Sequence, residues 1–138
     1  MKLLATILVA ATMFIANNLS AQNSNITATV LNATSDSGKV SYALYTKDNF
    51  RMDPIQAESS KIINGKSTVT FKNVPAGEYA IVCFHDKNDN DKLDFDEYGR
   101  PIEDYGVSNN VINRFGPPKY DDAKFAVADK NVTLNIKF

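Results

Sequence analysis

Apolar and polar residues alternate through most of this chain, and this two-residue period constrains the fold more than any other feature. Successive side chains of a strand point to opposite faces, so the pattern predicts strands with one buried face. It is clearest in Lys39–Tyr45 and Asn131–Phe138. No window of twelve or more residues keeps helical spacing, although Asp48–Ala57 could hold one short turn. The chain is therefore expected to be all-β.

Six or seven short strands are expected, with turn residues between them. Asn64-Gly65 is the strongest hairpin signal in the chain. The almost continuous apolar run Tyr79–Phe84 predicts a central strand that is covered on both faces. The fold predicted from these segments is an antiparallel Greek-key β-sandwich of about seven strands. The segments are Ile26–Leu31, Lys39–Tyr45, Glu58–Ile63, Lys66–Phe71, Tyr79–Phe84 and a final pair, Asp122–Val127 with Asn131–Phe138.

The N-terminal segment is predicted to be a secretory signal. Lys2 precedes the apolar run Leu3–Ile15, which is short for a membrane span, and Leu19-Ser20-Ala21 resembles a cleavage site. We expect residues 1–21 to be removed and residues 22–138 to form a single β-sandwich domain. The protein is then exported to the periplasm, the envelope or the outside of the cell, with no membrane span after cleavage. Cys83 is the only cysteine, so no disulfide can form within the chain.

The charge of the chain argues against a nucleic-acid partner. The formal net charge is −1, and it becomes −2 when residues 1–21 are removed, because they contain Lys2 and no acidic residue. Proteins that bind nucleic acids concentrate positive charge on one face to neutralise phosphates. No nucleic acid is expected to bind here.

The segment Asp86–Glu97 carries the clearest chemistry. Oxygen-bearing side chains occupy the first, third, fifth, ninth and twelfth positions, which is the spacing of an EF-hand-like Ca²⁺ loop. The sixth position is normally Gly, and Asp91 would have to adopt a positive φ there at a cost of about 1–2 kcal/mol. The predicted ligands are Asp86, Asn88, Asn90, the backbone carbonyl of Lys92, Asp94 directly or through water, and Glu97, with Glu103 and Asp104 as alternatives.

The alternative for this segment is an ordinary acidic turn, because Asp and Asn favour local side-chain turns. Eight of the 16 carboxylates lie between Asp86 and Asp104, against three basic residues, Lys87, Lys92 and Arg100. Such a concentration of like charge repels itself unless a cation neutralises it. The ligand spacing favours the Ca²⁺ site over the plain turn.

A long segment, Tyr98–Tyr120, interrupts the alternation with Gly and Pro clusters and several aromatic residues. A loop of this length in a compact domain is more often functional than accidental. Its aromatic residues are expected either to cover the end of the sandwich or to bind an unknown extracellular ligand. They are Tyr98, Tyr105, Phe115 and Tyr120.

Several separated motifs together resemble a known family. They are Gly77–Asn88 followed by Asn90 and Leu93-Asp94, then Tyr105–Asn110, Gly116-Pro117-Pro118 and Asp121–Phe125. The whole mature chain is similar to the secreted bacterial proteins grouped as domain-of-unknown-function family 2141. The resemblance implies a prealbumin-like (transthyretin-like) β-sandwich and a bacterial envelope or extracellular setting. It brings no established activity. This chain departs from the family pattern at Asp91, where the family often has Gly.

The preferred function is an exported Ca²⁺-binding module with a binding, adhesion or envelope-associated role and no enzymatic activity. One alternative is a hydrolase that uses His85, the only histidine, at the strand end; Cys83 shares its face. No oxyanion device, phosphate loop or zinc cluster accompanies these residues. Another alternative is a purely structural envelope domain without a ligand.

Overall fold

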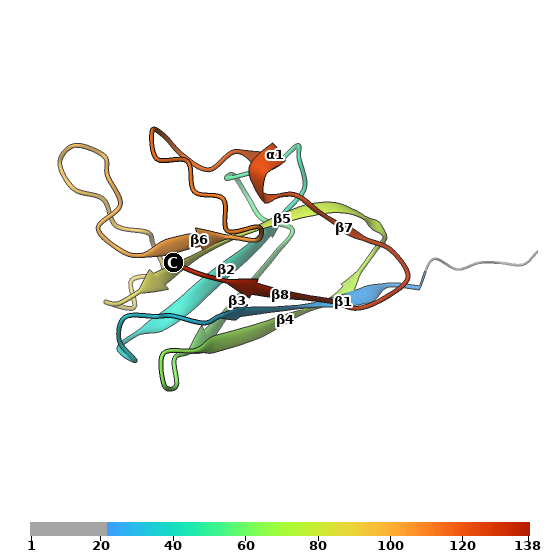
Figure 1. Cartoon of the computed structure of the whole chain (residues 1–138), viewed down its shortest axis with the longest axis horizontal. Helices are drawn as coiled ribbons and strands as arrows, with labels where there is room; N and C mark the ends of the chain where they lie inside the picture. Colours follow the sequence, from blue (N-terminus) through green and yellow to red (C-terminus); the bar gives the residue numbers. More distant parts are fainter. Residues whose placement is uncertain (1–21) are drawn as a thin grey trace, which may run out of the picture.

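The alternating segments form eight strands in two packed sheets (Figure 1), which confirms the predicted all-β sandwich. The computed structural model describes residues 22–138, so the predicted signal segment lies outside the described residues. One sheet has the order β4-β1-β8, and the other has the order β3-β2-β5-β6, with β7 paired to β5. The elements are β1 (Ser24–Val30), β2 (Lys39–Tyr45), β3 (Gln56–Lys61), β4 (Ser67–Val74), β5 (Gly77–Asp86), β6 (Tyr105–Val107), α1 (Tyr120–Ala123), β7 (Phe125–Val127) and β8 (Val132–Ile136).

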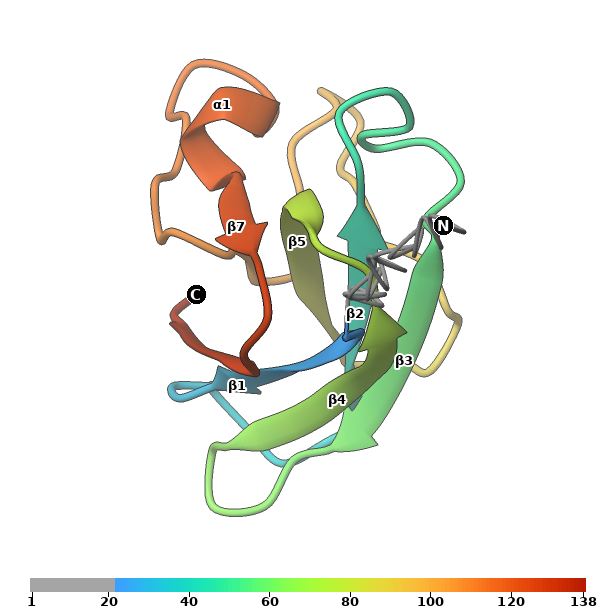
Figure 2. The ribbon, with the colours of Figure 1, turned by 90° about the vertical axis from the view of Figure 1, so that its right-hand side faces the viewer.

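One predicted strand pair forms only at its turn, and another is wrong. Asn64 and Gly65 adopt positive φ in a tight turn closed by an antiparallel bridge between Ile63 and Lys66. Beyond this bridge β3 pairs with β2 and β4 pairs with β1, so the turn joins the two sheets (Figure 2). The predicted final pair is absent, because β7 pairs with β5 and β8 runs parallel to β1. The β1–β8 pair is thus an exception in an otherwise antiparallel sandwich. Among the described residues, no helix is long and apolar enough to cross a membrane.

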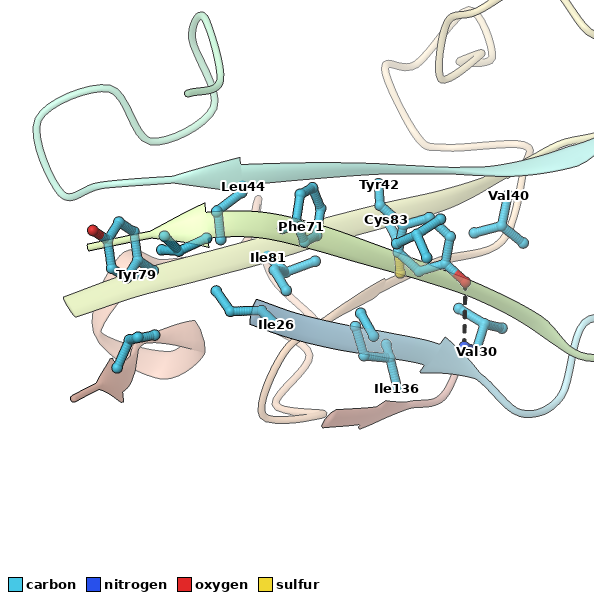
Figure 3. Packing of buried hydrophobic residues seen from close by; sticks show 14 of the residues in the cluster. Ile26, Val30, Val40, Tyr42, Leu44, Phe71, Tyr79, Ile81, Cys83 and Ile136 are labelled. Carbon is cyan, nitrogen blue, oxygen red and sulfur yellow. Dashed lines mark hydrogen bonds between the residues drawn. The ribbon is translucent and has the colours of Figure 1, made fainter. Parts of the chain in front are cut away.

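The main core fills the space between the sheets (Figure 3). Alternate residues of β1, β2 and β5 point into it, as their spacing predicts. Tyr42 is buried there, and its hydroxyl donates to the Ser67 carbonyl at 2.8 Å and accepts from the Val30 amide at 3.3 Å. Burial raises the pKa of Tyr42 to about 12. One buried side chain therefore links β2 to both β1 and β4.

A second, smaller cluster covers the outer face of β5. It contains Ala80 of β5, Val107 of β6, and Tyr120 and Ala123 of α1. Ser108 fixes the same region, because its hydroxyl donates to the Ala123 carbonyl and accepts from the Ile81 amide. The central strand β5 is therefore packed on both faces, as its continuous apolar run predicts.

Cys83 of β5 is expected to be unreactive in the folded protein. Its side chain is fully buried, and burial raises the pKa of the thiol far above its ordinary value. Only the thiolate attacks disulfide reagents, so both access and ionisation protect the sulfur. Ellman's reagent at pH 8 should label less than a few per cent of the native protein and one thiol per chain in concentrated guanidinium. Rapid labelling without denaturant would contradict this burial.

Candidate cation site

Asp86, the last residue of β5, anchors the loop that follows. Its side chain is fully buried, and its two carboxylate oxygens accept hydrogen bonds from the backbone amides of Asn90 at 3.0 Å and Asp91 at 2.9 Å. A buried carboxylate is costly unless it is hydrogen-bonded or paired. Asp86 therefore holds the loop in a turn around its own side chain.

Three more of the predicted ligand residues meet inside this turn. The amide nitrogen of Asn88 donates to the Asp94 carboxylate at 2.7 Å, and that of Asn90 donates to both Asp94 oxygens at 3.0 Å. The side-chain oxygens of Asn88 and Asn90 accept the backbone amides of Asn90 and Lys92, two residues further on. Asp91 has a φ of 62°, so the sixth position takes the left-handed backbone that the spacing requires. Asp86, Asn88, Asn90 and Asp94 thus belong to one connected network.

The closing position differs from the simple twelve-residue pattern. Glu97 is exposed and forms no hydrogen bond or ion pair with residues 22–138. Glu103 instead is only 7% exposed, and its oxygens accept the amides of Lys87 at 2.9 Å and Asp94 at 3.1 Å. Asp104 pairs with Lys87 at 3.3 Å and accepts a hydrogen bond from Thr34. Of the two alternatives that the sequence offers, Glu103 is the one that contacts the loop beside Asp94.

Lys39 of β2 is a member of the site that sequence reasoning missed. It lies opposite Asp86 in the β2–β5 register, and its ammonium group is 2.6 Å from Asp91, 3.6 Å from Asp89 and 3.7 Å from Asp86. The hydrogen bond to Asp91, with the charges of the three carboxylates, raises the pKa of Lys39 despite its partial desolvation. The neighbouring strand therefore supplies a positive charge that three carboxylates of the loop share.

The second half of the loop is organised around Asp96. Its carboxylate accepts the backbone amides of Tyr98 and Arg100 and pairs with the Arg100 guanidinium at 2.7 Å. These hydrogen bonds, first among them that from the Arg100 backbone, lower the pKa of Asp96. Asp96 thus closes its own turn with Tyr98 and Arg100.

The acidic, cysteine and histidine side chains of residues 22–138 do not form a metal-binding cluster by themselves. No group of three or more His, Cys, Asp or Glu side chains in residues 22–138 is placed to hold a metal ion. The three carboxylates of the predicted ligand set, Asp86, Asp94 and Glu97, therefore do not form such a group. The other predicted ligands are two Asn amides and the Lys92 backbone carbonyl. Such neutral oxygens are ordinary ligands of Ca²⁺.

His85 does not meet the requirement for a general base that contacts substrate. It is fully buried, stacks on Phe138 and has one ring nitrogen 2.8 Å from the Ser37 carbonyl. It lines neither of the two surface cavities described for residues 22–138. The other ring nitrogen, Nδ1, has no hydrogen-bond partner among these residues. Cys83 lies on the same face of β5, and its sulfur contacts the Gly106 carbonyl.

The four aromatic residues predicted to cover the sandwich or bind a ligand have different environments. Tyr120 is buried in the second cluster, where it covers the outer face of β5. Tyr98 is exposed beneath the Arg100 guanidinium, and Phe115 is 99% exposed. Tyr105 and Phe115 both line one surface cavity. The segment therefore combines a covering role at Tyr120 with accessible aromatic surface elsewhere.

Comparisons with known proteins identify a family and no activity. A family model described as "Uncharacterized protein conserved in bacteria (DUF2141)" matches residues 28–135, which include the whole acidic loop and the aromatic segment. No curated protein and no solved structure matches the chain. The prealbumin-like character of the sandwich therefore stays a prediction.

Proposed function

The chain belongs to the DUF2141 family of uncharacterized bacterial proteins, and we propose that it is an exported Ca²⁺-binding β-sandwich module whose ion clamps the loop after β5. The observation that carries this proposal is the connected network of Asp86, Asn88, Asn90 and Asp94. These are four of the six ligands that the spacing predicts, and the fold joins them by hydrogen bonds. Export rests on the signal-like pattern of residues 1–21.

The chemistry of these groups favours Ca²⁺. Carboxylates, amide oxygens and backbone carbonyls are hard oxygen ligands, which suit Ca²⁺ or Mg²⁺ better than a transition metal. Ca²⁺ tolerates a flexible set of six to eight ligands, whereas Mg²⁺ demands near-octahedral geometry. The side-chain amides of Asn88 and Asn90 present N–H groups to Asp94. A half-turn of each amide would direct its oxygen to the ion in exchange for the hydrogen bonds that the oxygens accept from the Asn90 and Lys92 backbone.

The surrounding fold favours a structural clamp over a switch. The loop follows the central strand of a sandwich, and Glu103 and Asp86 fix it to the end of β5. Extracellular modules bind Ca²⁺ with dissociation constants of about 10⁻⁴–10⁻³ M, so a site of this class would be filled outside the cell. An ion that binds only the folded chain stabilises it by mass action.

Thermal unfolding tests the proposal. At 10 mM Ca²⁺, a dissociation constant of about 10⁻⁴–10⁻³ M gives about 1.4–2.7 kcal/mol of stabilisation. For a domain of this size we expect the melting temperature to rise by about 5–10 °C relative to the protein in EGTA. A melting temperature that is the same in both buffers would leave the purely structural domain as the better account.

Matched variants at Glu97 and Glu103 should identify the carboxylate that closes the site. Glu97→Gln and Glu103→Gln each remove one charge and preserve the shape of the side chain. Because Glu103 contacts the loop beside Asp94, we expect Glu103→Gln to lose at least half of the Ca²⁺-dependent rise in melting temperature. Glu97 is exposed, so Glu97→Gln should keep most of this rise. The reverse result would restore Glu97 as the closing ligand of a simple twelve-residue loop.

A further inference from the structure

The three arginines of this chain, Arg51, Arg100 and Arg114, all line one cavity on the outer side of the sandwich. The cavity has a volume of about 690 Å³, and most of its lining residues belong to the end of the acidic loop and to the loop that precedes α1. Figure 1 shows the course of these two loops. Its size is in the range of pockets that bind small molecules. Among the described residues, no aspartate, glutamate or lysine lines it. In a chain with a net negative charge, this is a marked local concentration of positive charge.

Within residues 22–138, two of these arginines have no partner for their charge. Arg100 pairs with Asp96, but Arg51 and Arg114 form no ion pair and no side-chain hydrogen bond with residues 22–138. Arg51 also has a φ of 62°, and every other non-glycine residue with positive φ in the described part of the chain is Asn or Asp. A long side chain in this conformation costs free energy, which is characteristic of binding and catalytic positions.

The remaining walls of the cavity are largely apolar. Val82 of β5, which packs against the second cluster and not the main core, lines the cavity together with Leu93, Phe95 and Phe115. Phe115 is 99% exposed and Phe95 is 54% exposed. Large aromatic side chains at the mouth of a charged cavity provide contact area for a ligand with an apolar body.

We propose that this cavity binds a small organic carboxylate whose acidic head is held by Arg51 and Arg114 and whose aromatic or aliphatic body lies against Phe95 and Phe115. The guanidinium group presents paired donors that match the two oxygens of a carboxylate. This proposal goes beyond the proposed ion site and does not rest on it. Leu93 and Phe95 belong to the same loop as the candidate cation site, so an ordered loop would also order one wall of the cavity.

Titration calorimetry with defined probes tests this assignment. The probes are 2-naphthoate and decanoate, with 2-naphthamide as the uncharged match and 2-naphthyl phosphate as the alternative anion. We expect at least one of the two carboxylates to bind. The dissociation constant of 2-naphthamide should be at least about tenfold higher than that of 2-naphthoate, because the amide carries no charge. The dissociation constant of 2-naphthyl phosphate should be less than about tenfold lower than that of 2-naphthoate. No heat from either carboxylate at millimolar concentration, or equal binding of the amide, would overturn the proposal. A tenfold preference for the phosphate would overturn the choice of a carboxylate.

Matched charge variants locate the site. Arg51→Gln and Arg114→Gln should each weaken carboxylate binding by about tenfold, since each removes a charge-assisted hydrogen bond. Lys61→Gln removes the same charge from exposed β3, outside the cavity, and should bind like the wild type. Wild-type affinity in both arginine variants would refute the site. Each titration is repeated in EGTA, which tests the carboxylate site without the ion. The melting temperature with Ca²⁺ is measured separately and tests the ion site alone, so failure of one site is distinguishable from failure of the other.

Discussion

Replacing Phe71 by alanine is expected to lower the free energy of unfolding by about 3–5 kcal/mol, as truncation of a fully buried aromatic side chain generally does. Phe71 lies on β4, is fully buried and projects into the main core between the sheets (Figure 3). The cost combines lost apolar burial with the cavity that remains. A domain of this size has a total stability of about 5–15 kcal/mol, so the variant should be close to unfolding at 37 °C. Urea denaturation followed by circular dichroism measures the difference.

The matched control is Phe115→Ala. It removes the same atoms from a side chain that is 99% exposed, so the free energy of unfolding should change by less than about 0.5 kcal/mol. Similar losses for the two variants would contradict the assignment of the core to the space between β4 and β5.

Replacing Asp86 by asparagine is expected to have two separable effects. In EGTA, the variant should be less stable by about 2–3 kcal/mol, because a buried carboxylate that accepts two backbone amides becomes a group with only one acceptor oxygen. With 10 mM Ca²⁺, it should also lose the rise in melting temperature that the wild type gains. Differential scanning calorimetry of both proteins in both buffers measures the two effects independently.

Asp121→Asn is the control for this variant. Its carboxylate is 76% exposed, lies in α1 and pairs with Lys124 at 3.5 Å. The control should keep the stability of the wild type and its full response to Ca²⁺. If Asp86→Asn kept the Ca²⁺ response as well, the ion would not bind where we propose.

The strands that the sequence predicts well are those with a local signal. The alternation in β2 and the apolar run of β5 identify both elements within a few residues. Local sequence patterns do not indicate which strand pairs with which when the two strands are distant in sequence. Asn131–Phe138 is recognisable as a strand, but its pairing with β1 joins residues more than a hundred positions apart. The local turn after β7 therefore suggested a hairpin that the tertiary fold does not form.

The short elements of the long aromatic segment illustrate the same limit. β6 spans only Tyr105–Val107, which is too short for a period to be recognised, and its place is set by the register of Val107 with Val82 of β5. Its backbone is also held close to the C-terminus. A Cβ atom at Gly106 would lie 2.8 Å from the Ile136 side chain and from the Lys137 carbonyl oxygen. Long-range packing, and not propensity, makes this segment a strand.

The candidate cation site was predictable in part. The spacing of Asp86, Asn88, Asn90 and Asp94 identifies residues that the loop brings into one network, because consecutive Asx turns are local. Lys39 could not be found in this way, since it reaches the loop across the β2–β5 pair. The arginine cavity likewise joins three segments that are far apart in sequence. Only the folded chain shows that the three arginines line one cavity.

Direct titration of Ca²⁺ into metal-free protein tests the central proposal most directly. Isothermal titration calorimetry should give one site per chain with a dissociation constant of about 10⁻⁴–10⁻³ M, and no saturable binding for Asp86→Asn. The absence of saturable binding to the wild-type protein at 10 mM Ca²⁺, with Asp121→Asn and wild type both folded, would contradict the account.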